Sequence, residues 1–258
     1  PVGAAISGGV DSSSIACLMR KASPDSEIHT FSYIAADPKI SEEFWVDVAV
    51  KAAGSVGHKV RIDETTLFEK DLDDLIRAQG EPFSTLSIYA QFKVFELAKQ
   101  TGIKVTLDGQ GADELLAGYH GYPAAKLLGL LKKLDFGSLR DFVRVWGSWP
   151  GRTSKSLLGV SLAEFFPEAR RSSSLVSLAH VLGLVGDQSL ELFSRGAKKL
   201  AARSGESNRR DKRFKGRRLA ETLGLALGPS GLTTLLRFAD RNSMYSSIES
   251  RVPFLNKK

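Results

Sequence analysis

The sequence has a single cysteine, Cys17, among 258 residues. One cysteine excludes an internal disulfide and any zinc site built from several thiolates, and it favours a reducing compartment, so we expect a cytoplasmic protein. No apolar stretch approaches the roughly 18 residues that a membrane-spanning helix needs, so we expect no membrane association. The glycine-rich signature with a lysine that defines P-loop nucleotide-binding proteins is also missing. Because the chain begins with Pro1 and shows no signal peptide, we interpret it as a piece of a longer protein.

Charge of both signs is present but unevenly divided, for a net charge of +7. Residues 1–120 contain 18 Asp and Glu against 11 Lys and Arg, whereas residues 121–258 contain 11 against 25. Seven of the ten residues at 209–218 are basic, and such a run could bind a polyanion. Only Phe214 is interleaved there as a group that could stack on a base. We therefore interpret the run as a solvated surface and do not expect a nucleic-acid partner.

Apolar spacing in the first 120 residues alternates between the period of a strand and the period of a helix. Strand and helix in alternation predict an α/β fold, a parallel sheet with helices on both faces. The predicted strands cover 2–7, 28–34, 58–63 and 103–107, and the predicted helices cover 12–21, 42–53, 67–78, 87–100 and 112–117.

Beyond residue 120 the strand signals are few, and leucine-rich spacing predicts helices instead. We therefore predict two parts: an α/β core over 1–120 and a mostly helical remainder over 121–258 that packs on it. The predicted helices of this remainder cover 127–134, 157–163, 190–202, 219–227 and 232–248.

The strongest motif is Ser-Gly-Gly-Val-Asp-Ser-Ser at residues 7–13, between a predicted strand and a predicted helix. Two glycines let backbone N–H groups close on a phosphate, and the start of the helix adds further free N–H donors. Asp11 repels a phosphate unless a cation lies between them, which predicts Mg²⁺. The alternative is a plain Gly-Gly turn in which Asp11 caps the helix.

The second motif, Asp-Gly-Gln-Gly-Ala-Asp-Glu at residues 108–114, also follows a predicted strand and opens a helix. In a parallel sheet both motifs lie at the carboxyl edge, where ligands bind. Asp113 could then share a magnesium ion with Asp11. The alternative is that Asp113 and Glu114 only complement the positive end of a helix.

Two further blocks stand near the end of the chain: Asp-Arg-Asn-Ser-Met at 240–244 and Ile-Glu-Ser-Arg-Val-Pro-Phe-Leu at 248–255. With the first two motifs, in this order and at about this spacing, they resemble the synthetase domain of glutamine-hydrolysing asparagine synthetases. The first motif alone is shared with other ATP-pyrophosphatases, including NAD and GMP synthetases. The resemblance implies an adenine nucleotide alpha-hydrolase-like fold across nearly the whole chain.

That family uses ATP to convert the side-chain carboxylate of aspartate to an acyl-adenylate, releasing pyrophosphate, and ammonia then gives asparagine and AMP. The resemblance implies the same activity here, with aspartate or a similar carboxylic acid as substrate and a homodimer as a possible assembly. It implies Mg²⁺ on Asp11 and Asp113, and catalysis by Asp11, Gln110, Asp113 and Arg241, with Arg241 reaching the phosphates. The residues that it places around ATP are Ile6, Ser7, Gly8, Gly9, Asp11, Ser12, Tyr33, Asp108 and Gly109.

Three features depart from the family pattern. Gln110 stands where members often have Glu, and an amide cannot act as a base at pH 7, which leaves the acceptor acid open. The glutaminase domain, with its N-terminal cysteine nucleophile, is absent, so ammonia must come from elsewhere. We interpret Cys17 as a small buried thiol instead. Asn256 stands where Asp is usual.

Other residues carry weaker signals. The four histidines, His29, His58, His120 and His180, lack metal-ligand spacing. The resemblance implies that the stretch 81–87 could face the acceptor pocket, although N-capping of the next helix explains its hydroxyls equally well. We interpret Glu249 and Arg251 as helix residues that stabilise the chain end.

Three alternatives to asparagine synthesis stay open. The first is a related amidotransferase that acts on another carboxylate. The second is an RNA-modifying use of the same ATP site, and the third is an ATP-binding remnant without activity.

Overall fold

The computed structural model describes residues 2–62, 66–83, 85–119, 121–148, 218–229 and 231–256. The chain divides into two compact units, Pro1–Leu116 with Gly228–Lys258, and Ala117–Leu227. The predicted helices at 157–163 and 190–202 lie outside the described residues, as do His120, His180 and the basic run except Arg218.

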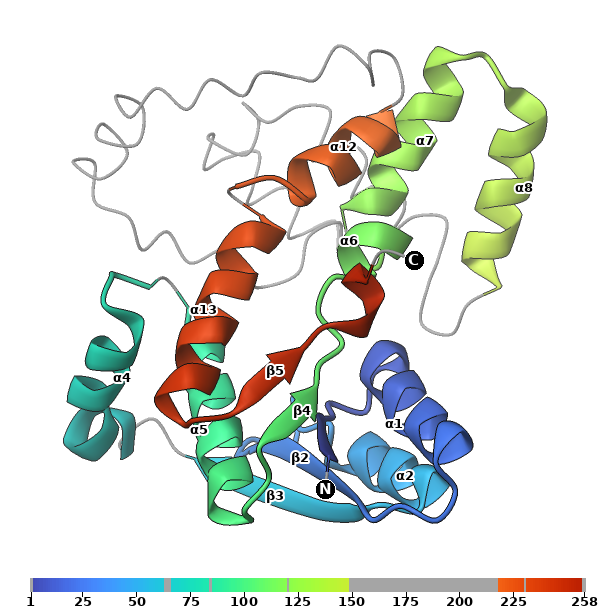
Figure 1. The fold of residues 1–258 in the computed structure, drawn as a ribbon. Coiled ribbons are helices and arrows are strands. Elements are labelled where there is room, and N and C mark those ends of the chain that lie inside the picture. Colours follow the sequence, from blue (N-terminus) through green and yellow to red (C-terminus); the bar gives the residue numbers. More distant parts are fainter. Residues whose placement is uncertain are drawn as a thin grey trace. The chain divides into compact units, whose positions relative to one another are not determined.

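The first unit is built on a five-stranded sheet in which every strand pair is parallel (Figure 1). The order of the strands is β3-β2-β1-β4-β5. The strands are β1 (Val2–Ala5), β2 (Ile28–Ala35), β3 (Val56–Ile62), β4 (Val105–Leu107) and β5 (Glu249–Arg251). The predicted parallel sheet is confirmed, and four of these strands fall within a residue or two of their predicted places.

Helices cover both faces of this sheet, as the alternation of elements predicts. Helices α1 (Val10–Ala22) and α2 (Glu43–Ala53) enclose a cluster that includes Ile34 of β2. Phe31, three residues earlier on the same strand, packs instead with α5 (Ser87–Gln100). Successive side chains of a strand point to opposite faces, so β2 contributes to the cores on both sides of the sheet.

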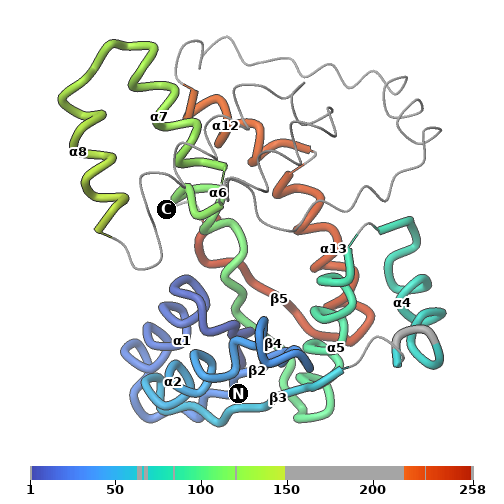
Figure 2. Tube along the Cα trace, turned by 180° about the vertical axis from the view of Figure 1, so that it is seen from behind, coloured from blue at the N-terminus to red at the C-terminus, as the bar shows by residue number. Residues whose placement is uncertain are grey.

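The C-terminal helix α13 (Leu232–Tyr245) belongs to the first unit and lies beside α5 (Figure 2). It also packs on α4 (Leu72–Gln79), which continues from a wider turn at Leu67–Asp71. Our predicted division at residue 120 groups α13 with the helical remainder, whereas its contacts place it with the α/β core. Hydrophobic spacing identifies α13 as a helix but does not say which partner buries its apolar face.

Strand β5 was not predicted, and Glu249 and Arg251 are strand residues rather than helix residues. Ser247 takes a left-handed conformation with φ of 57° and ends the preceding helix. The Glu249 N–H then donates to the Lys104 carbonyl at 2.8 Å, which brings the segment onto the edge of β4. Two residues apart on a strand share one face, and Arg251 Nε lies 2.8 Å from Glu249 Oε1.

Three described helices form the second unit: α7 (Tyr122–Lys132), α8 (Phe136–Gly147) and α12 (Arg218–Ala226). Helix α7 contacts both of the others. Helix α8 was not predicted; the Asp135 carboxylate caps it by accepting from the Ser138 N–H at 3.0 Å. Within the described ranges of both units, no helix combines the length and apolar character that crossing a bilayer requires.

Candidate functional site

The segment between β1 and α1 is a tight loop that serine hydroxyls hold together. The Ser7 N–H donates to Ser12 Oγ at 3.1 Å, and Ser12 Oγ donates to the Gly9 carbonyl at 3.3 Å. The Ser13 N–H donates to the same carbonyl at 3.1 Å. These bonds fold residues 7–13 back onto the first turn of the helix, as a phosphate loop requires.

Gly8 is the one position in this loop that a side chain could not occupy. Its φ is +78°, and a Cβ there would stand 2.7 Å from the Cβ of Trp45 and 2.8 Å from the Trp45 carbonyl carbon. Trp45 lies on α2 and forms the wall of the loop. The sequence singles out Gly8 but not Trp45, since nothing local relates a tryptophan 37 residues away to this turn.

The start of α1 has no side-chain cap. Gly9 is its N-cap residue and makes no capping hydrogen bond, while Asp11 lies within the first turn. The alternative in which Asp11 caps the helix is therefore wrong. The first N–H groups of a helix have no intrahelical acceptor, so an uncapped start can bind an anion.

The second motif packs directly against the first. A Cβ on Gly109 would lie 3.3 Å from the Ser12 backbone nitrogen and 3.6 Å from Asp11 Cβ. Gly111, with φ of +91°, has no room for a Cβ because Leu255 Cδ2 would be 2.5 Å away. The Asp108 N–H donates to the Arg251 carbonyl at 2.8 Å. The loop after β4 thus lies between the phosphate loop and the end of the chain.

The two acidic residues predicted to bind Mg²⁺ influence each other. Burial raises the pKa of Asp113 most, and the negative charges of Asp11 and Glu114 raise that pKa further. Nowhere in the described ranges do three or more His, Cys, Asp or Glu side chains cluster as a metal site. Two carboxylates, completed by phosphate oxygens and water, are nevertheless the set that Mg²⁺ commonly uses. The residues present therefore fit a magnesium ion that arrives with its nucleotide.

Asp108 and Gln110 are half-buried polar residues in the same loop as Asp113. Burial raises the pKa of Asp108, while the N–H groups of Gln110 and Gly109 lower it. The side-chain oxygen of Gln110 is buried and has no hydrogen-bond partner among the described residues. An orphaned buried acceptor costs stability unless a ligand or water supplies a donor.

Ile6 and Tyr33 lie at the carboxyl ends of adjacent strands, where we predict the nucleotide. The Ile6 N–H donates to the Phe31 carbonyl at 2.9 Å, and Ile6 itself is buried. Tyr33, two residues past Phe31 on β2, is 38% exposed. A backbone contact suits Ile6, whereas the Tyr33 ring remains accessible to a ligand.

Arg241 lies in a second group of contacts. Its Nη1 donates to the Gln79 carbonyl and stands 2.9 Å from Glu81 Oε1. Among the described residues, these contacts join Arg241 to the α4–α5 loop and none joins it to residues 7–13. Its predicted role at the phosphates stays a prediction.

The neighbouring Asn242 anchors this group. Gln79 Nε2 donates to Asn242 Oδ1 at 2.6 Å, and Asn242 Nδ2 donates to the Ile88 carbonyl at 2.9 Å. Both side chains are completely buried. Helix α5 begins after Leu86 with no side-chain cap, so N-capping does not explain the hydroxyl of Thr85.

Two residues near Arg241 were missed as functional candidates. Glu81 appears in the sequence only as part of an uncertain stretch, and Arg237 was not singled out. Arg237 Nε lies 2.8 Å from Glu81 Oε1. The spacing of Arg237 and Arg241, one helical turn apart, could have indicated a shared partner.

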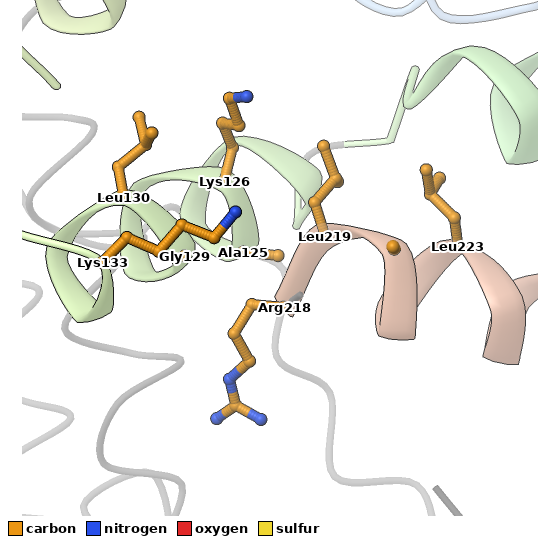
Figure 3. A pocket seen from close by; sticks show the side chains of 9 residues that line it. Ala125, Lys126, Gly129, Leu130, Lys133, Arg218, Leu219 and Leu223 are labelled. Atoms are coloured by element: carbon orange, nitrogen blue, oxygen red, sulfur yellow. The ribbon is translucent and has the colours of Figure 1, made fainter. Parts of the chain in front are cut away.

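A separate pocket of about 250 Å³ lies between α7 and α12 in the second unit (Figure 3). Lys126, Lys133 and Arg218 rim an otherwise apolar lining. Arg218 is partly neutralised, because its Nη1 stands 3.9 Å from Glu221 Oε2. None of the predicted site residues lines this pocket.

Comparison with known proteins supports the motif assignment. The sequence model of a family described as asparagine synthase matches residues 1–258. A Methanocaldococcus jannaschii protein named as a glutamine-hydrolysing asparagine synthetase is 32% identical over 173 residues, 67% of this chain and 32% of that protein. A similarly named Mycobacterium tuberculosis protein is 32% identical over 187 residues, 70% of this chain and 28% of its own.

Asparagine synthetase 1 of Bacillus subtilis, also named as glutamine-hydrolysing, is 31% identical over 178 residues. That match covers 68% of this chain and 24% of the relative. The chain therefore spans a third or less of the length of each of these relatives.

Proposed function

Because the chain belongs to the asparagine synthase family, we propose that it is the ATP-using part of a carbon–nitrogen ligase that activates a carboxylate as an acyl-adenylate. The observation that carries the proposal is the junction of the two motifs, where Gly109 packs on Asp11 and Ser12. The start of α1, which has no side-chain cap, lies at this junction. So do Asp11 and Asp113, and the charge of Asp11 raises the pKa of Asp113. Both features are at the carboxyl edge of the sheet. That edge is where parallel α/β folds bind nucleotides.

In this proposal ATP lies across the carboxyl ends of β1, β2 and β4. The loop 7–13 and the first N–H groups of α1 bind the phosphates. Tyr33 contacts the nucleoside with its exposed ring, and Ile6 and Gly109 contact it through the backbone. The lack of a Cβ at Gly8 lets the loop pack against Trp45, and the lack of one at Gly109 lets the two loops approach each other closely.

Asp11 and Asp113 would hold Mg²⁺ in this proposal. When bound, Mg²⁺ neutralises charge that develops on the departing pyrophosphate. The pKa of Asp113 is raised mainly by burial and further by the negative charge of Asp11, so a cation between the two carboxylates would lower their electrostatic energy.

The reaction that this site supports has two balanced steps. A carboxylate oxygen of the acceptor attacks the α-phosphorus of ATP, and the bond to pyrophosphate breaks. Ammonia then attacks the acyl carbon, the bond to AMP breaks, and a proton leaves the new amide. Arg241, positioned by Glu81 and the Gln79 carbonyl, supplies a fixed cation for the pyrophosphate.

We propose aspartate as the acceptor, with asparagine as the product. A second candidate is a related carboxylic acid, and the neutral Gln110 favours it. The orphaned Gln110 oxygen can accept a hydrogen bond from a ligand but cannot take up a proton at pH 7. An acceptor or nucleophile with an N–H or O–H group at that point satisfies the buried atom.

The relatives are named as glutamine-hydrolysing, and this chain spans 24% to 32% of their lengths. We propose that ammonia reaches the site from a glutaminase domain or subunit. We also propose that the protein acts in the cytoplasm and that its active form is a homodimer. The basic run at 209–218 and an RNA substrate are not part of the proposal.

The test is pyrophosphate release from Mg-ATP, with ammonium chloride as the nitrogen source and a panel of carboxylic acids. Asp11→Asn should abolish release, while Asp25→Asn, in an exposed turn after α1, should leave it unchanged. Release that requires aspartate supports asparagine synthesis, and release with another acid keeps the chemistry but replaces the product. No release with any acid contradicts the proposal.

A further inference from the structure

Two arginines on α13 converge on one carboxylate oxygen. Arg237 Nε lies 2.8 Å and Arg241 Nη1 lies 2.9 Å from the same atom, Glu81 Oε1. This oxygen is buried from solvent, and both contacts are ion pairs whose geometry does not make a hydrogen bond to it. The two residues are one turn apart, so the helix itself brings both guanidinium groups to the same side.

The charges in this group do not balance. Within the part of the chain that the structure describes, two guanidinium groups face a single carboxylate, which leaves one positive charge in excess. An arginine keeps its charge at any pH that a folded protein survives, so the excess cannot be removed by deprotonation. A second anion would therefore lower the electrostatic free energy of the group.

Unused hydrogen-bond donors accompany the excess charge. Among the described residues, Arg241 donates a hydrogen bond only through Nη1, to the Gln79 carbonyl, and none accepts a hydrogen bond from Arg237. The remaining N–H groups of both guanidinium groups therefore have no hydrogen-bond acceptor among the described residues. A guanidinium fork matches the paired oxygens of a carboxylate or a phosphate. Arg237 is 50% and Arg241 is 34% exposed at the side chain, so a dissolved anion can reach them.

The group is held rigidly enough to act as a binding site. The backbone carbonyl of Gln79 accepts from Arg241, and the buried Gln79 and Asn242 side chains join α4 to α13. The Arg237 guanidinium also lies over the Phe238 ring, with its carbon 5.8 Å from the ring centroid. Ordered arginines lose less conformational entropy when they bind a ligand.

We infer that Arg237 and Arg241, positioned by Glu81, form a two-arginine site for an oxyanion of the substrate. Arg237 is the new member, because neither its sequence context nor the family resemblance assigns it a role. The proposed function assigns Arg241 to the pyrophosphate end of ATP. A carboxylate of the acceptor acid presents the same paired oxygens and is the other source of the anion. The choice between these two sources rests on the proposed function, whereas the site itself does not.

The experiment is calorimetric titration of the whole chain with sodium pyrophosphate and, separately, with sodium aspartate, both without Mg²⁺. Arg237→Gln should weaken binding of one anion by about tenfold or more, the loss expected for a charge-assisted hydrogen bond. Arg77→Gln is the matched control, because Arg77 lies on α4 in an exposed ion pair with Asp74. Such pairs contribute little, so the control should bind as the wild type does.

Arg237→Lys tests the geometry of the fork, since it keeps the charge but loses the paired donors. The affinity of Arg237→Lys for the anion should fall between those of the wild type and Arg237→Gln. The lysine variant also keeps the test usable if Arg237→Gln does not fold. Loss of pyrophosphate binding alone identifies the phosphate source, and loss of aspartate binding alone identifies the carboxylate source.

Two results would overturn the inference. One is that Arg237→Gln and Arg237→Lys both bind the two anions as tightly as Arg77→Gln does. The other is that the wild-type chain binds neither anion. If pyrophosphate release fails while Arg237-dependent anion binding persists, the proposed function is wrong and the two-arginine site stands.

Discussion

The loop at 7–13 and the two-arginine group both lie in the first unit, but the first is formed mainly by backbone and the second by long side chains. The loop at 7–13 depends on the lack of a side chain at Gly8. It also depends on hydrogen bonds of the Ser12 hydroxyl to residues no more than five positions away in the sequence. The group around Arg241 depends on long side chains from α4, α5 and α13, up to 163 residues apart. The comparison teaches that a backbone site can be identified from a local motif, whereas a side-chain site depends on how helices pack.

The largest expected effect is that of Gly8→Ala. The new Cβ would meet Trp45 at 2.7 Å with φ at +78°, so overpacking and a left-handed alanine act together. We expect a loss of about 3 kcal/mol in the free energy of unfolding, together with loss of nucleotide binding. Urea denaturation measures the first and nucleotide titration the second.

Gly102→Ala is the matched control, because Gly102 has φ of +77° but no atom within 4 Å of the new Cβ. It should cost about 1 kcal/mol, from the left-handed conformation alone. Equal losses in the two variants would mean that contact with Trp45 does not shape the loop.

Next in size is Asn242→Ala, which tests the side-chain site. Removal of this amide leaves Gln79 Nε2 without its 2.6 Å bond and the Ile88 carbonyl without its donor. We expect a loss of about 2 kcal/mol in unfolding free energy, since both groups are buried. Asn256→Ala, at an exposed position, is the control and should leave the denaturation midpoint in place.

The arginine group should also respond to Asn242→Ala, because Asn242 follows Arg241 on the helix. If anion binding is unchanged while stability falls, the amide network stabilises the fold without positioning the arginines.

A smaller effect concerns pH and the paired carboxylates. The pKa of Asp113 in the folded protein is raised, so the folded state holds this proton more tightly than the unfolded state. In the absence of Mg²⁺, the free energy of unfolding should therefore fall as pH rises from below 3.8 through the folded pKa. Denaturation at a series of pH values measures this slope, and Asp113→Asn should reduce it.

Asp11→Asn removes the neighbouring negative charge and should lower the pKa of Asp113 toward its usual value. An unchanged pH profile in this variant would mean that the charge of Asp11 does not affect Asp113. The support for a shared magnesium ion would then be lost.

The smallest expected effect lies outside both regions, at the His29–His58 contact between β2 and β3. Burial and the neighbouring His29 lower the pKa of His58, whose Nε2 lies 2.9 Å from His29 Nδ1. The folded state therefore favours neutral His58, and stability should fall as pH drops below 6.5 toward the folded pKa. His58→Gln should flatten this part of the profile without changing the affinity for nucleotide or pyrophosphate.

Much of the α/β unit could be predicted from sequence because its signals are local. Period-two and helical spacing located β1 to β4 and the helices between them, and glycines marked the loops that must be tight. Strand β5 could not be predicted in this way. Its three residues become a strand only because the Lys104 carbonyl offers a hydrogen bond at the edge of β4.

The candidate site divides along the same line. Asp11, Gln110 and Asp113 were found because each stands in a motif with glycines, and the fold brings these motifs together. Arg237 was missed because it stands in no recognisable pattern, and Glu81 was named only as part of the stretch 81–87. Their contact joins positions 156 residues apart, which no local pattern indicates. Arg241 was found by resemblance, yet its partners could not be foreseen.

By itself the sequence determined the parallel order of strand and helix, the tight glycine loop at 7–13 and the family to which the chain belongs. Each rests on neighbours in the chain, where backbone sterics and hydrophobic period act at short range. Only the tertiary structure decided that Trp45 packs against the loop at 7–13 and that α13 packs on the α/β core. It also decided that Glu81 forms ion pairs with both Arg237 and Arg241. Those contacts arise from packing between distant segments, which the order of residues in any one segment does not specify.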